Sequence, residues 1–189
     1  MWPAVESADV AGMSARQVRL ALWCMARLSI VDVEVVRRLA HRAGQVAASM
    51  DGFLVSNTVW ALGVLGVGQV DITPLVHSFV GQLHKTDGHN CSSMIYAMHQ
   101  VGWVDPEHYL EITTHFAGLG SEVPQQYSNI LWAVSQRSKE PPQELGVLVD
   151  GLLACRDKAK PQDFSNALLA LNVWCTSNAG QVGTLLSKA

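Results

Sequence analysis

The sequence predicts an all-α fold, a right-handed α-solenoid superhelix of about five two-helix repeats. A degenerate motif of the form Ser-Asn-x-apolar-Trp-Ala recurs five times along the 189 residues. Its Trp position falls at residues 23, 60, 96, 132 and 169, so consecutive copies lie 37, 36, 36 and 37 residues apart. No segment shows the strict apolar–polar alternation that is typical of a strand.

The motif forms the first helix of each repeat, which we call helix A. These helices are expected at 17–28, 54–65, 90–101, 126–137 and 163–174, and position 0 denotes the Trp position, occupied by Trp23, Trp60, Tyr96, Trp132 and Leu169. With 100° per residue, the apolar positions −5, −1, +2 and +5 share one broad side, beside a small residue at +1. The opposite side carries Ser at −4, Asn or Ser at −3, and variable residues at +3 and +4. Each segment is therefore predicted to be an amphipathic helix.

A second helix, helix B, is expected after each helix A. The entry signals are acidic N-caps and first-turn prolines, namely Asp32, Asp71, Asp105 and the pair Pro141–Pro142. The turn between the second A and B helices is expected at 63–68, and the last helix B near 182–188. The predicted repeats span 14–50, 51–87, 88–122, 123–159 and 160–189. Helices of ~12–16 residues are marginal alone, so the repeats must stack on one another.

Composition narrows the class of protein. Apolar residues make up 49% and charged residues 15%, which excludes a disordered chain. Charged or polar residues interrupt every apolar stretch before the ~18 residues of a membrane span, so no membrane association is expected. Because neither end shows a polar capping helix, we expect the array to be part of a longer protein.

No catalytic or metal-binding constellation is present. The four cysteines form no C-x-x-C pair and the seven histidines show no zinc-ligand spacing. Nucleophile-elbow and phosphate-loop motifs are also missing. We therefore expect no enzymatic activity, no cofactor, no metal and no small-molecule substrate.

The segments 124–133 (PQQYSNILWA) and 161–170 (PQDFSNALLA) resemble the octotricopeptide repeat family, whose units look like P-Q-x-(L/F)-x-N-x-L-W-A-L followed by a second helix. The resemblance covers nearly the whole chain and is weakest in repeats one and three, where Arg19-Leu20 and Ser92-Ser93 replace Ser-Asn. It implies a soluble protein of chloroplasts or mitochondria that binds single-stranded RNA in transcript stability, processing or translation. Other proteins of an RNA-processing complex are implied as further partners. No targeting peptide is visible at the N-terminus.

The polar sides of the A helices form the candidate RNA surface. Amides can read the edges of single-stranded bases, and five repeats would contact roughly five nucleotides. The recurrent Asn at −3 favours a structural role, whereas the variable +3 and +4 positions are better candidates for specificity. The predicted site residues, which include arginines of the first repeat, are Arg16, Arg19, Arg27, Asn57, Ser93, His99, Gln100, Asn129, Ser135, Gln136, Asn166 and Asn172.

Two questions stay open at this level. A protein-interaction scaffold is the alternative function, since a net charge of −3 and a pI of about 6.1 provide no general attraction for RNA. The charge is uneven, however, because six of the 13 basic residues are arginines in the first 42 positions. The aromatic residues at position 0 are expected to wedge between repeats rather than to stack on bases.

Overall fold

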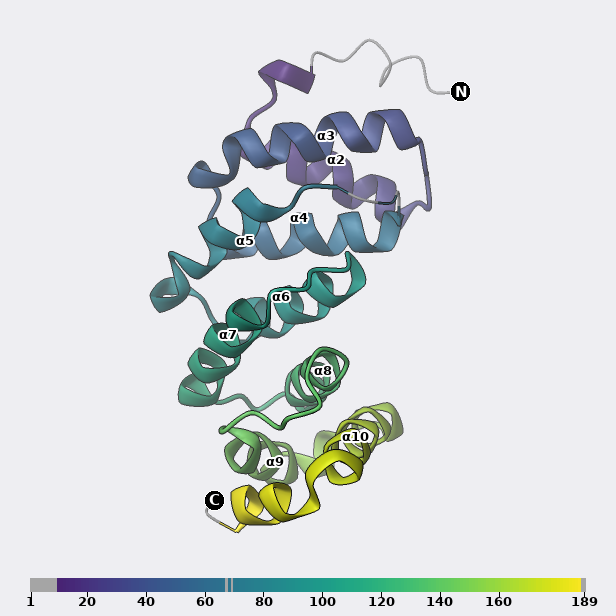
Figure 1. Cartoon of the computed structure of the whole chain (residues 1–189). Coiled ribbons are helices and arrows are strands. Elements are labelled where there is room, and N and C mark those ends of the chain that lie inside the picture. Colours follow the sequence, from purple (N-terminus) through teal and green to yellow (C-terminus); the bar gives the residue numbers. More distant parts are fainter. Residues whose placement is uncertain (1–9, 67, 69, 188–189) are drawn as a thin grey trace. The chain divides into compact units, whose positions relative to one another are not determined.

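The computed structural model describes residues 10–66, 68 and 70–187 of the chain (Figure 1). Within these residues there are nine α-helices and four short 3-10 helices, and there is no strand. The prediction of an all-α protein is therefore confirmed. The five predicted A helices correspond to α2, α4, α6, α8 and the first part of α10.

The chain divides into two compact units, and the first comprises 1–86 together with 100–103. It contains α2 (Ala15–Arg27), α3 (Val33–Val46), α4 (Gly52–Leu65) and α5 (Thr73–Val80). The A helices α2 and α4 pack against each other, and the B helices α3 and α5 pack on them. Figure 1 shows α3 and α5 in front of α2 and α4. The core between the two layers includes Leu22, Leu39, Leu75 and Phe79.

The second unit comprises 87–99 and 104–189. It holds α6 (Gly88–Gln100) up to His99, then α7 (Pro106–Leu119), α8 (Pro124–Ser135), α9 (Leu145–Ala154) and α10 (Pro161–Leu186). Helix α8 packs against both α9 and α10, and α9 also packs against α10. Within α10, Asn178 has non-helical backbone angles, so the helix breaks there and its last part takes the place of the predicted final helix B.

Most predicted helix starts are found where the sequence placed them. Asp32 accepts hydrogen bonds from the N–H groups of Glu34 and Val35 at the start of α3, and Asp105 caps α7 ahead of Pro106. Near the start of α5, the carboxylate of Asp71 accepts from Thr73 N–H at 2.9 Å. These bonds satisfy N–H groups that a helix leaves unpaired in its first turn.

The turn predicted at 63–68 begins later than expected. Helix α4 continues through Gly63 to Leu65 and ends at Gly66, whose φ of 58° suits a glycine. Gly63 has a packing role instead, because a Cβ there would lie 2.9 Å from the Gln100 side chain. The close approach of the Gln100 side chain to the backbone of α4 therefore explains the glycine at position 63 better than a turn does.

The prediction that Ser at −4 lies on the polar side is wrong for three of the repeats, although Ser165 on α10 is exposed as predicted. Ser56, Ser92 and Ser128 are buried. Each hydroxyl donates to the carbonyl three residues earlier in its own helix, so burial leaves no unpaired hydroxyl. The Ser128 hydroxyl also lies 3.3 Å from the Asp163 carboxylate, and it therefore joins α8 to α10. On α8, position −4 is therefore part of the contact with α10.

Candidate nucleic-acid interface

Position −4 is buried on α4, α6 and α8, so the accessible edge of these A helices is narrower than expected. Positions −7, −3, 0 and +4 fall at about 20°, 60°, 0° and 40°, so they form one narrow strip. We call this strip the outer ridge. In the first unit it consists of Arg16, Leu20, Trp23 and Arg27 on α2, Phe53, Asn57, Trp60 and Val64 on α4, and Gln100. In the second unit it consists of His89, Ser93 and Tyr96 on α6, Gln125, Asn129, Trp132 and Gln136 at α8, and Gln162, Asn166, Leu169 and Val173 on α10. Every one of these side chains is exposed or half-buried.

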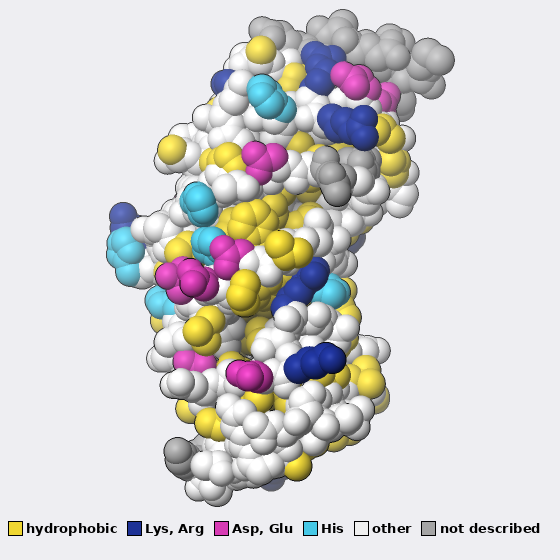
Figure 2. Space-filling model, viewed as in Figure 1, with side chains coloured by type: hydrophobic (Ala, Val, Ile, Leu, Met, Phe, Trp, Pro, Cys, Tyr) yellow, Lys and Arg dark blue, Asp and Glu magenta, His cyan; other side chains and the backbone are white. Residues whose placement is uncertain are grey.

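The outer ridge contains no acidic residue. Helices α2, α4, α6 and α8 have no Asp or Glu at all, and α10 has only Asp163, which is buried. Acidic residues lie instead on B helices, for example Glu34 on α3 and Asp150 on α9, and in the loops. Figure 2 shows acidic side chains in magenta on the face where α3 and α5 lie in front. The net charge of −3 therefore does not describe the A helices, and a polyanion meets no carboxylate along the ridge.

The positive end of the ridge is on α2. Arg16 and Arg27 are exposed, and the guanidinium carbon of Arg27 lies 5.8 Å from the Trp23 ring centroid. Half-buried Arg19 places its guanidinium carbon 5.6 Å from the ring centroid of Phe53 on α4. Both arrangements are cation–π contacts that orient the guanidinium without neutralising it. The three predicted arginines thus all lie on α2.

The amide at position −3 has a local structural role. Asn57 donates from Nδ2 to the carbonyl of Phe53 at 2.9 Å, which is a bond within its own helix rather than to an inter-helix loop. Asn166 accepts at Oδ1 from the Gln162 side chain at 2.7 Å. Ser93 and Asn129 are half-buried at the equivalent positions. A carbonyl oxygen or an amide therefore remains at the surface at several points along the ridge.

The position-0 aromatic residues are half-buried, and two of them, Tyr96 and Trp132, contact each other between neighbouring repeats. The Trp132 ring centroid lies 5.6 Å from that of Tyr96 and 4.7 Å from that of His99, both on α6. Trp23 and Trp60 are half-buried as well, and Leu169 is 55% exposed. The rings therefore combine inter-repeat packing with an accessible aromatic surface.

His99 is held in place rather than freely presented. Burial, with a smaller contribution from the nearby Arg137 cation, lowers the pKa of His99 below its usual value. Arg137 also donates from Nη2 to the His99 carbonyl at 3.0 Å. His99 is thus neutral near pH 7, and Arg137 fixes the chain next to exposed Gln136.

Of the twelve predicted site residues, Ser135 is the one that the structure removes from the surface. It is 5% exposed, and its hydroxyl donates to the Trp132 carbonyl at 2.7 Å. Position +3 falls at about −60°, on the side of α8 that α10 covers. The equivalent Asn172 on α10 is exposed. Gln100 and Gln136, at +4, are exposed.

Sequence reasoning missed position −7. His89, Gln125 and Gln162 are exposed one helical turn before position −3, on the same strip. Their angle of about 20° was available from the periodicity.

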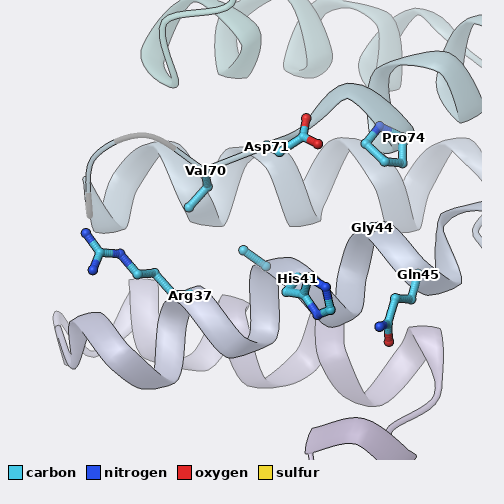
Figure 3. A pocket seen from close by; sticks show the side chains of 8 residues that line it. Arg37, His41, Gly44, Gln45, Val70, Asp71 and Pro74 are labelled. Atoms are coloured by element: carbon cyan, nitrogen blue, oxygen red, sulfur yellow. The ribbon is translucent and has the colours of Figure 1, made fainter.

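A separate cleft of about 490 Å³ lies on the B side of the first unit (Figure 3). Arg37, His41 and Gln45 line it from α3, and Val70 and Asp71 line it from the segment that enters α5. In Figure 3 the Asp71 carboxylate points away from Arg37, so these groups do not converge on one point. Hydrogen bonds from Thr73 lower the pKa of Asp71, which assigns that carboxylate a capping role. This cleft has the chemistry of an ordinary polar surface.

Other classes of site were also considered. Among the described residues no group of three or more His, Cys, Asp or Glu side chains is placed to hold a metal ion. No helix within the described part of the chain has the length and apolar character to cross a membrane. Neither models of known protein families nor the curated proteins include one that matches this chain.

Proposed function

We propose that this chain binds single-stranded RNA along the outer ridge and carries out no catalytic step. The observation that supports it most strongly is the absence of exposed carboxylates from the A helices, which present amide and aromatic groups and, on α2, arginines. In this proposal the two units continue one right-handed α-solenoid superhelix of the octotricopeptide type. The resemblance to that family adds a role in RNA stability, processing or translation in chloroplasts or mitochondria.

Single-stranded RNA matches the chemistry of the ridge. Unpaired bases stack on aromatic rings and guanidinium planes, and amides bond their edges. The ridge offers both, with half-buried aromatic rings at position 0 and amides at −7, −3 and +4. Duplex RNA fits less well, because its bases are stacked on each other and their edges are hidden in a deep groove.

In this proposal, the side chains at the positions that vary between repeats distinguish one RNA base from another. Position +4 holds Arg27, Val64, Gln100, Gln136 and Val173 in the five repeats. Position −3 is nearly constant, and the side-chain amide of Asn57 donates a hydrogen bond to the Phe53 carbonyl of its own helix. We assign position +4, supported by position −7, to base selection and position −3 to the frame of the helix.

A protein scaffold is the second candidate, and one observation favours it. The second unit exposes large apolar side chains on and next to its B helices. They are Val104, which precedes α7 and is 76% exposed, Leu110 on α7 and Val147 on α9. Clusters of exposed apolar groups are typical of protein contacts. This surface is separate from the ridge, so a partner protein and RNA can bind the chain together.

The test is a binding titration with a matched pair of charge insertions. Fluorescence anisotropy with a random single-stranded RNA pool should show saturable binding that weakens as salt rises, because cations are released from the phosphates. Gln136→Glu puts a carboxylate on the ridge. At about 6 Å from a phosphate in water it costs about 0.7 kcal/mol, or about a threefold loss of affinity.

Gln143→Glu is the control, because Gln143 is also exposed and lies before α9, outside the ridge. It makes the same change in net charge and should leave affinity unchanged. Equal losses in the two variants would place the RNA elsewhere. Absence of any salt-sensitive binding by the unmodified chain would overturn the proposal.

A further inference from the structure

One face of α10 is exposed although the equivalent face of α8 is buried. We call positions −4, −1 and +3 the downstream face, because they point toward the next A helix. On α8 these positions are Ser128, Leu131 and Ser135, all buried. On α10 they are Ser165, Leu168 and Asn172, all exposed. Leu168 is 65% exposed, whereas its equivalents Leu131 and Ile95 are 0% exposed.

The structure also shows what such a face packs against. Helix α10 packs against α8, and its position −6 contacts position −4 of α8; we call positions −6, −2 and +1 of an A helix its upstream face. On α10 these are Asp163, Ala167 and Ala170, and all three are buried. Asp163 lies 3.3 Å from the Ser128 hydroxyl, and Trp174 donates from Nε1 to the Ser138 carbonyl at 3.0 Å. Small residues and one polar pair therefore define this contact.

An upstream face is accessible at the other end of the described chain. On α2 it consists of Gln17, which is exposed, and of Ala21 and Cys24, which are half-buried. Leu28, at the position of fully buried Trp174, is 65% exposed. Neither this face nor the downstream face of α10 bears a charged side chain.

We propose that a second copy of this chain docks the upstream face of its α2 on the downstream face of α10. The contact repeats the packing of α10 on α8 and buries Leu168 against Ala21 and Cys24. Because both faces are uncharged, no ion has to be desolvated. The association is heterologous: each copy contributes a different surface, so one end of every pair stays open.

The polar groups of the two faces are complementary. The Ser165 hydroxyl already donates to the Pro161 carbonyl at 2.9 Å, so its oxygen can act as an acceptor. Gln17 uses its Oε1 to accept from Ser14 N–H at 2.9 Å, and its amide N–H groups remain available. A bond from Gln17 Nε2 to Ser165 Oγ takes the place of the Ser128–Asp163 pair.

Sedimentation velocity over a range from low micromolar to several hundred micromolar tests the proposal without RNA. The average mass should rise with concentration above the 20.5 kDa of one chain. Leu168→Glu and Ala21→Glu should each abolish the rise, while helical CD signals stay unchanged. Leu153→Glu is the control, since Leu153 is an exposed leucine on α9 outside both faces.

Mixing the two disabled variants tests the direction of the contact. Leu168→Glu retains an intact α2 face and Ala21→Glu retains an intact α10 face, so an equimolar mixture should form a dimer and nothing larger. A chain that stays monomeric at every concentration, or a mixture that shows no dimer, would overturn the proposal and assign the α10 face to a different helix.

Discussion

Asp163 provides the sharpest test of how successive A helices are held together. Its Oδ2 accepts from the Lys160 N–H at 2.8 Å, which caps α10, and its Oδ1 lies 3.3 Å from the Ser128 hydroxyl on α8. Replacement by Ala removes both. Loss of a cap costs about 1 kcal/mol, and loss of a buried hydrogen bond to a charged group costs about 1.5 kcal/mol more. We expect Asp163→Ala to lower the free energy of unfolding by about 2–3 kcal/mol.

Urea unfolding followed by far-UV CD measures this loss. With an m-value of about 2 kcal/mol/M, the midpoint should fall by about 1–1.5 M. Asp163→Asn retains an acceptor and should show less than half of that shift. Asp157→Ala, which removes a carboxylate that is 94% exposed, should leave the midpoint unchanged. If Asp163→Ala behaved like Asp157→Ala, the Ser128–Asp163 contact would not hold α8 and α10 together.

Three further predictions concern the outer ridge and its surroundings. Trp132→Ala should cost about 1.5–3 kcal/mol in the same urea assay, less than the ~3–5 kcal/mol of a fully buried Trp, because the ring is half-buried; a loss near zero would assign the ring to base stacking alone. His99→Ala and Gln136→Ala should change the bases enriched from a random RNA pool while the CD spectrum is preserved, and unchanged enrichment would exclude them from base reading. The unfolding free energy should fall as pH drops below about 6.5, because the lowered pKa of His99 means that the unfolded chain binds the proton more readily. His99→Gln should flatten this pH dependence, and an unaltered slope would contradict the burial argument.

The helices themselves could be predicted from periodicity. The motif spacing located all five A helices, and acidic N-caps located the starts of α3 and α7, because these signals are local to the chain. The start of α9 at Leu145 lies beyond the prolines that were expected to mark it. The break at Asn178 in α10 coincides with an N-cap residue that the sequence analysis did not use: Asn178 Oδ1 accepts from Gln181 N–H at 3.2 Å, where the last helical part begins.

The orientation of each helix could not be predicted as well as its position. The helical-wheel angles place serine, as a polar residue, on the solvent side of the helix. A serine hydroxyl can instead donate to a carbonyl of its own helix and be buried, as Ser92 does. Gly63 was read as part of a turn, although the structure shows a close approach of Gln100. Both errors arise because a pattern in one helix does not show which neighbour covers it. For the same reason, the sequence analysis includes buried Ser135 among the site residues and omits the exposed residues at position −7.

Photo-crosslinking tests the central proposal most directly. A single-stranded RNA containing 4-thiouridine is bound to the chain, irradiated, digested and mapped by mass spectrometry. Crosslinks are predicted on peptides that carry Trp60, Tyr96 and Trp132, the accessible aromatic residues of α4, α6 and α8. Peptides from the B helices α3, α7 and α9 should stay unmodified. Crosslinks concentrated on those B helices, with none on the outer ridge, would contradict the account.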